Sequence, residues 1–187
     1  LIKLEAIKID NSPAAPLFTL IVGPSIEGKQ IGKTKKDLGE RGKLRLEFWT
    51  KLLNFAKEKT KLHASISPRQ YSWVGTSAGV RGVAYNYVLR QHDSVVEVYI
   101  DLGADQDSRN LEIYHSFFRN KDEIEDVFGE DLIWEPLENR RACRISFKIT
   151  IGGWKDQDRW DNMFESMVSK MIKMEKAFKP FVKKIKN

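Results

Sequence analysis

The sequence has 187 residues, of which 41% are hydrophobic and 31% charged, and its formal net charge is +6 at pH 7. This balance is typical of one globular domain with a substantial core. A single cysteine, Cys143, excludes an internal disulfide and a thiolate-rich metal site, and no apolar run is long enough to cross a bilayer. We therefore expect a cytoplasmic protein that needs no cofactor, no metal and no membrane.

The first segment predicts two strands. Apolar residues alternate near Leu1, a turn-forming stretch follows, and a second apolar run surrounds Phe18. We interpret residues 1–24 as a strand hairpin that continues into one domain over residues 25–187. Because the chain starts at Leu1 and not at a methionine, we also expect a missing N-terminal part.

Residues 25–43 combine several glycines with a cluster of basic side chains. Glycine is costly inside a helix, so this composition predicts a basic, mobile, glycine-rich loop. Helical spacing of apolar residues then predicts helices over about 43–61, 110–128 and 157–186, and residues 120–122 could bend or split the second. Gly129 is the expected stop of that second helix.

Period-two alternation predicts further strands near Val83, Val95 and Arg144. Strands of this kind need one buried face, and amphipathic helices can cover it. The predicted fold is therefore α+β, with an antiparallel sheet of about five strands, those near Leu1 and Phe18 included. Three main amphipathic helices pack mostly on one face of it.

The run from Tyr71 to the C-terminus carries a series of short motifs that together resemble one known family. They comprise Trp73 with Gly75, Gly79 and Gly82; Val96 to Asp101; Asn110 and Phe117; Ile124, Glu125, Phe128, Gly129, Leu132, Trp134, Glu135 and Leu137; and Arg140, Arg141, Ala142, Arg144 and Ile145. The family is an uncharacterised prokaryotic domain of unknown function found C-terminal to restriction-endonuclease-like nuclease domains. Pro136 departs from the arginine that the pattern has after Glu135.

This resemblance implies an accessory domain whose partner is a nuclease domain upstream in the full-length protein. It also implies that the strands of residues 1–24 are linker strands between the two parts. It supplies no catalytic residue for the present chain. We therefore expect a domain that is not itself an enzyme.

Charge is unevenly distributed along the chain. Residues 93–139 hold fourteen acidic side chains and three basic ones, so the rest of the chain is strongly basic. Arginine and lysine arrays bind phosphate backbones by releasing condensed counterions, which favours nucleic acid as a partner. The expected contacts are Lys33, Lys35, Lys36, Arg41, Lys43, Arg140, Arg141, Arg144, Lys170 and Lys173. Trp73 and Tyr85 are candidates for stacking on a base, with core positions as the alternative.

Two other hypotheses remain open. The acidic helix of one copy could meet the basic final helix of another, which makes the domain an oligomerisation or partner-binding module. Alternatively the chain is a Mg²⁺-dependent nuclease, for which Asp10, Glu27 and Lys29 are the only candidates. Lysines on the outer face of a helix are usually just solvated, and that reading competes with all three.

Overall fold

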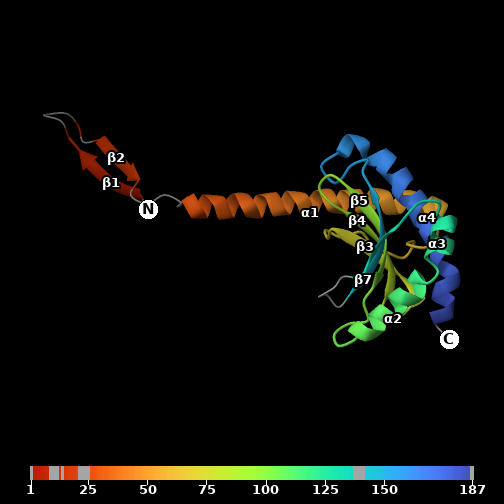
Figure 1. Cartoon of the computed structure of the whole chain (residues 1–187). Helices are drawn as coiled ribbons and strands as arrows, with labels where there is room; N and C mark the ends of the chain where they lie inside the picture. Colours follow the sequence, from red (N-terminus) through yellow and green to blue (C-terminus); the bar gives the residue numbers. More distant parts are fainter. Residues whose placement is uncertain (1, 9–12, 14, 21–25, 137–141, 186–187) are drawn as a thin grey trace. The chain divides into compact units, whose positions relative to one another are not determined.

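The computed structural model describes residues 2–8, 13, 15–20, 26–136 and 142–185. Two compact units, Leu1–Glu40 and Arg41–Asn187, make up the chain. Figure 1 shows their elements, which in order are β1 (Ile2–Ile7), β2 (Ala15–Leu20), α1 (Ile26–Lys59), β3 (Trp73–Val80), β4 (Val83–Leu89), β5 (Ser94–Ile100), α2 (Asp107–Phe118), α3 (Lys121–Phe128), β6 (Ile133–Glu135), β7 (Cys143–Ile149), the short 3₁₀ helix η1 (Gln157–Arg159) and α4 (Trp160–Ile185).

The glycine-rich segment 25–43 is helical where it is described, so the prediction of a loop is wrong. Helix α1 runs without interruption from Ile26 to Lys59. Each glycine costs a helix about 1 kcal/mol, but most of the intervening residues are good helix formers. Extending an existing helix also avoids the cost of nucleating a new one.

The first unit contains its own small sheet. Strands β1 and β2 pair antiparallel, with Ile2 opposite Leu20 and Ile7 opposite Ala15. We expected these strands to join the main sheet, and that part of the prediction is wrong. A hairpin pairs its strands locally, and the alternating pattern that reveals a strand does not identify its partners.

The second unit is built on a five-stranded antiparallel sheet with the order β3-β4-β5-β7-β6. The predicted α+β class with a five-stranded antiparallel sheet is therefore confirmed, although β3 and β6 take the places given to the strands near Leu1 and Phe18. In register, Tyr85 lies opposite Val98, which lies opposite Ile145. All three side chains are buried.

Helices cover the face of the sheet that carries these residues. Helix α4 packs against β3, β4, β5 and β7, and α2 packs against β5 and β7. Figure 1 shows α4 and α3 along the same side of the sheet. The aromatic ring of Phe48 on α1 contacts those of Trp160 and Phe164 on α4, with 5.1 Å between ring centroids in both pairs.

The expected helix over 110–128 is divided into α2 and α3. Asn120 lies between them, and its side-chain amide donates a 2.7 Å hydrogen bond to the carbonyl of Ser116. Gly129 ends α3 in the left-handed conformation, with φ 88°, as predicted.

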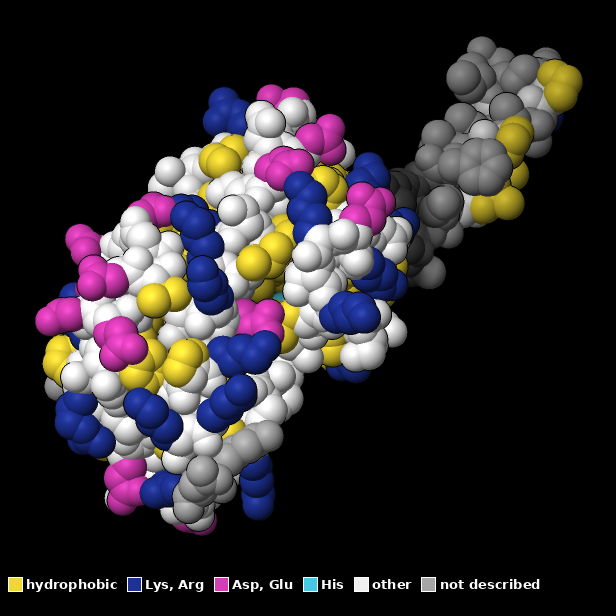
Figure 2. All heavy atoms as spheres, turned by 90° about the vertical axis from the view of Figure 1, so that its right-hand side faces the viewer, with side chains coloured by type: hydrophobic (Ala, Val, Ile, Leu, Met, Phe, Trp, Pro, Cys, Tyr) yellow, Lys and Arg dark blue, Asp and Glu magenta, His cyan; other side chains and the backbone are white. Residues whose placement is uncertain are grey.

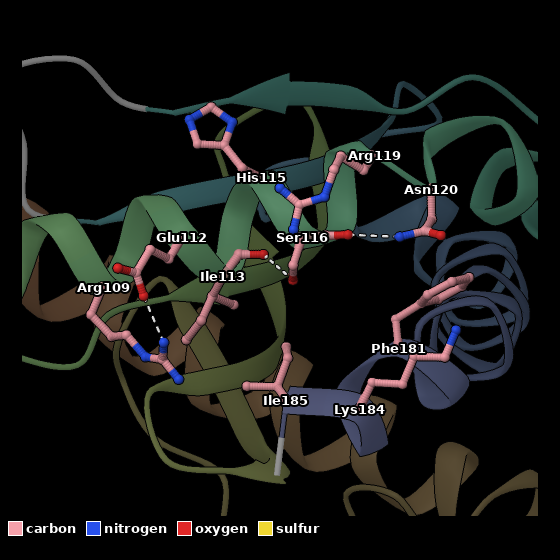
Figure 3. A pocket seen from close by; sticks show the side chains of 10 residues that line it. All are labelled: Arg109, Glu112, Ile113, His115, Ser116, Arg119, Asn120, Phe181, Lys184 and Ile185. Atoms are coloured by element: carbon pink, nitrogen blue, oxygen red, sulfur yellow. Dashed lines mark hydrogen bonds and ion pairs between the residues drawn. The ribbon is translucent and has the colours of Figure 1, made fainter. Parts of the chain in front are cut away.

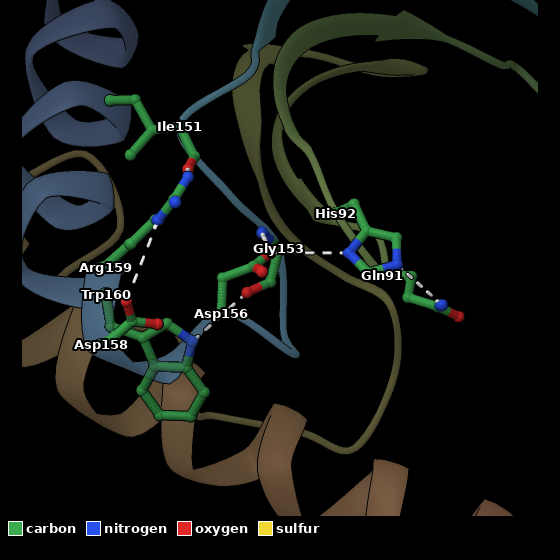
Figure 4. A network of polar contacts seen from close by, with 8 residues as sticks. All are labelled: Gln91, His92, Ile151, Gly153, Asp156, Asp158, Arg159 and Trp160. Atoms are coloured by element: carbon green, nitrogen blue, oxygen red, sulfur yellow. Dashed lines mark hydrogen bonds and ion pairs between the residues drawn. The ribbon is translucent and has the colours of Figure 1, made fainter.

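A corner of loops attaches the start of α4 to the β4–β5 turn, as Figure 4 shows. Gly153 packs so closely against this turn that a Cβ there would lie 2.4 Å from the carbonyl oxygen of Arg90. Its amide donates to Asp156, and its carbonyl accepts from the indole nitrogen of Trp160 at 3.3 Å. This corner fixes the direction in which α4 leaves the sheet.

Candidate nucleic-acid interface

The C-terminal half of α4 presents a row of basic side chains. We call Lys173, Lys176, Lys179, Lys183 and Lys184 the lysine face; all five are exposed. Their spacing of mostly three or four residues places them on one side of the helix. Among the described residues, Glu175 pairs with this row and lies 3.6 Å from Lys179. Figure 2 views the helical side of the molecule, where Lys and Arg side chains occur in the upper as well as the lower part.

Beside the lysine face lies a cleft between α2 and the end of α4, shown in Figure 3. Its volume is about 650 Å³. Arg109 and Arg119 from the α2 side and Lys184 from α4 contribute three cations. Glu112 pairs with Arg109 at 2.6 Å. The cleft is therefore an extension of the basic surface and not a neutral groove.

Lys170 has a structural role. Its ammonium group forms an ion pair with Glu130 and lies 4.7 Å from the ring centroid of Phe147 and 5.7 Å from that of Phe128. Burial, followed by the charge of Lys173, lowers the pKa of Lys170. Of the two predicted contacts on α4, Lys173 is the one that faces solvent.

Arg41 and Lys43 lie on α1, and Lys43 is exposed. The guanidinium of Arg41 lies 5.4 Å from the ring centroid of Trp154, a cation–π contact. Trp154 precedes the first turn of α4, whereas Lys173 is thirteen residues beyond Trp160, or roughly 20 Å along the helix axis. Arg41 is therefore remote from the lysine face.

Arg144 also lies apart from the lysine face. Its neighbours Cys143 and Ile145 point toward the helices, so strand alternation directs Arg144 to the opposite face of the sheet. There it pairs with Glu135 through hydrogen bonds of 2.8 Å and lies 3.9 Å from the buried carboxylate of Glu97.

Glu97 is the centre of a polar cluster on that second face. The amide of Asn86 donates to the Glu97 carboxylate at 3.1 Å, and both residues are 5% exposed. Burial raises the pKa of Glu97, an effect that the hydrogen bond from Asn86 and the charge of Arg144 only partly offset. Trp73, 51% exposed, belongs to the same face of the sheet, whereas Tyr85 is buried in the core.

Other predicted contacts lie on α1 or outside the described residues. Lys33, Lys35 and Lys36 belong to α1 in the first unit. Arg140 and Arg141 fall outside the residues that the structure describes. The expected basic surface is therefore not continuous. Lys173 lies on α4, Arg41 lies against Trp154, and Arg144 lies on the second face of the sheet.

The nuclease candidates do not share a strand context. Glu27 and Lys29 lie on α1, and Asp10 falls outside the described residues. Within the described residues no group of three or more His, Cys, Asp or Glu side chains could hold a metal ion. No described helix is long and apolar enough to cross a membrane.

The profile of the DUF4268 family, a domain of unknown function, matches residues 44–182. The chain belongs to this family. The match confirms the expected relation to an uncharacterised domain family, and it covers nearly all of the second unit. Neither the curated proteins nor the solved structures gave a match to this chain.

Sequence reasoning missed the two arginines of the cleft in this DUF4268 domain. Arg109 and Arg119 lie in the acidic stretch, where their charges are outnumbered. The spacing of Arg109, Ile113, Ser116 and Asn120 follows one side of a helix and continues past the end of α2, and this pattern could have pointed to a shared surface. Their approach to α4 depends on tertiary packing, which the pattern does not contain.

Proposed function

We propose that this chain is an accessory nucleic-acid-binding domain that holds the phosphate backbone on the lysine face. The observation that carries the proposal is the row of five exposed lysines on α4, with Arg119 and Arg109 beside it in the α2–α4 cleft. Flexible lysines suit contacts with successive phosphates because each is a mobile point charge. In the full-length protein the domain would deliver nucleic acid to a nuclease domain upstream.

The charges around the lysine face support a phosphate contact more than a solvated surface. Solvated helix faces usually alternate positive and negative residues, because such pairs stabilise the helix. Here one acidic residue, Glu175, accompanies the five lysines. Repulsion among these lysines costs stability, which a bound polyanion would relieve.

A salt titration of binding to short fluorescent DNA and RNA duplexes tests the proposal. For the wild-type chain we expect the logarithm of affinity to fall linearly with the logarithm of salt concentration between roughly 0.05 and 0.3 M. Lys176→Gln, Lys179→Gln and Lys183→Gln together should lower the slope by about 3 and weaken binding by on the order of tenfold or more.

The matched control removes three exposed cations elsewhere, with Lys57→Gln, Lys61→Gln and Arg69→Gln. It changes the net charge of the protein by the same amount. If the two triple variants weaken binding equally, net charge and not the lysine face accounts for the affinity. Absence of binding at low salt would refute the proposal.

Self-association is the second candidate, and the acidic surface of α3 favours it. Asp122, Glu123 and Asp126 are exposed there, opposite in sign to the lysine face. One copy could set its α3 against the α4 of the next. Light scattering decides this: a monomer at every salt concentration removes the hypothesis.

A further inference from the structure

The α2–α4 cleft combines an apolar floor with a cationic rim. Ile113 and Phe181 are buried and Ile185 is half-buried, whereas Arg109, Arg119 and Lys184 are exposed. Figure 3 shows these side chains around one hollow, which Ser116 of α2 also lines. The volume of the cleft lies in the range of small-molecule sites, and three of its ten lining residues are apolar while the other seven are polar or charged.

Two of the three cations are available to a ligand. Glu112 neutralises Arg109, but within the described part of the chain neither Arg119 nor Lys184 has a carboxylate partner. The ammonium of Lys184 lies 5.0 Å from the ring centroid of Phe181. A ligand with a flat ring for the apolar floor and an anionic group for the rim would match both features of the cleft.

We propose that this cleft binds one unpaired nucleotide, with its base on the apolar floor and its phosphate between Arg119 and Lys184. This inference rests on the proposed function and specifies the kind of nucleic acid. Lys183 and Lys184 adjoin in sequence, so the lysine face leads directly to the rim. The phosphates that follow the bound nucleotide would continue along the lysine face.

The shape of the cleft favours a strand end over a continuous duplex. In a duplex the bases are stacked inside and the phosphates lie on a convex cylinder, which cannot enter a hollow of about 650 Å³. An unpaired nucleotide has no such restriction, and its base gains contacts that a paired base lacks. The domain should therefore prefer a single strand, or a duplex with an overhang, to a blunt duplex.

Binding of three fluorescent probes to the full chain tests the inference: a blunt duplex, the same duplex with a short overhang, and a single strand. We expect about tenfold tighter binding of the two probes with unpaired nucleotides. Ile185→Trp, which fills the cleft without changing charge, should abolish this preference and leave blunt-duplex binding intact. Lys173→Gln, outside the cleft, should weaken all three probes to the same extent.

Thymidine monophosphate at millimolar concentration tests the cleft without the following phosphates of a strand. In amide NMR spectra of the wild-type chain we expect shifts at Ile113, Ser116 and Arg119, and their absence in Ile185→Trp. No shift in the cleft overturns this inference even if duplexes bind, in which case the proposed function stands. Equal affinity for all three probes also overturns it, because the cleft would then hold a free nucleotide and not a strand.

Discussion

The buried side chain of His63 makes the stability of the fold depend on pH. It is 1% exposed, and its Nε2–H donates to the carbonyl of Tyr85 at 3.0 Å. Nδ1 is buried without a hydrogen-bond partner, and the ring lies 4.7 Å from that of Tyr87, centroid to centroid. Burial, which outweighs the hydrogen bond to Tyr85, lowers the pKa of His63 to about 4.

Acid should therefore destabilise the fold through this residue. Between pH 6.5 and about 4 the unfolded chain binds a proton at His63 that the folded chain does not, so stability falls as pH falls. The full effect is about 3 kcal/mol of unfolding free energy. Urea unfolding at a series of pH values should show this slope in the wild type and its loss in His63→Phe. An unchanged slope would contradict the assignment, and His115→Phe, at an exposed histidine, is the control.

At the scale of elements, the periodicity of hydrophobic residues predicted most strands and helices, but it did not predict which strands pair. Alternation predicted the strands around Val83, Val95 and Arg144, because one side of each must be buried. Helical spacing predicted α4 nearly from end to end. The pattern could not show that β1 and β2 pair with each other, because alternation does not identify the partner of a strand. Nor could it show that α1 continues through its glycines, because the cost of each glycine competes with the helix propensity of its neighbours.

The helical state of the glycine-rich segment leads to a prediction about α1. Gly39 is exposed with nothing within 4 Å of where its Cβ would be, so Gly39→Ala should stabilise the helix by about 0.5–1 kcal/mol. At Gly42 a Cβ would lie 2.8 Å from Oε1 of Gln70, so Gly42→Ala should gain less. Far-UV circular dichroism and urea unfolding measure both. No gain in helicity at Gly39 would argue against a continuous helix, whereas equal gains at the two positions would mean that the Gln70 side chain moves aside.

In the whole molecule, negative and positive side chains are separated onto two neighbouring helices. Helix α3 carries exposed carboxylates and α4 carries the lysine face, and the two helices pack together. The sequence showed that acidic and basic residues are segregated along the chain. It could not show that Arg144 lies on the far side of the sheet from α4, because that depends on register and on which face the helices cover.

The acidic surface of α3 should limit where nucleic acid can lie. Replacement of Asp122, Glu123 and Asp126 by Asn, Gln and Asn removes three negative charges next to the lysine face. We expect faster association and up to about tenfold tighter binding at low salt, and a much smaller gain at high salt, because the effect is long-range and screened. Stopped-flow association rates at two salt concentrations measure it. A gain that persists at high salt would indicate a new direct contact instead.

The continuity of α1 has a practical consequence for any shortened version of this protein. Residue 44, where the family match starts, lies inside α1, past both Arg41 and Gly42. A fragment cut at that position would lose the contact of Arg41 with Trp154 and would expose the amide groups of a new helix end just before Phe48. The start of the family match therefore differs from the start of the part that folds stably. A stable fragment should begin upstream of Arg41.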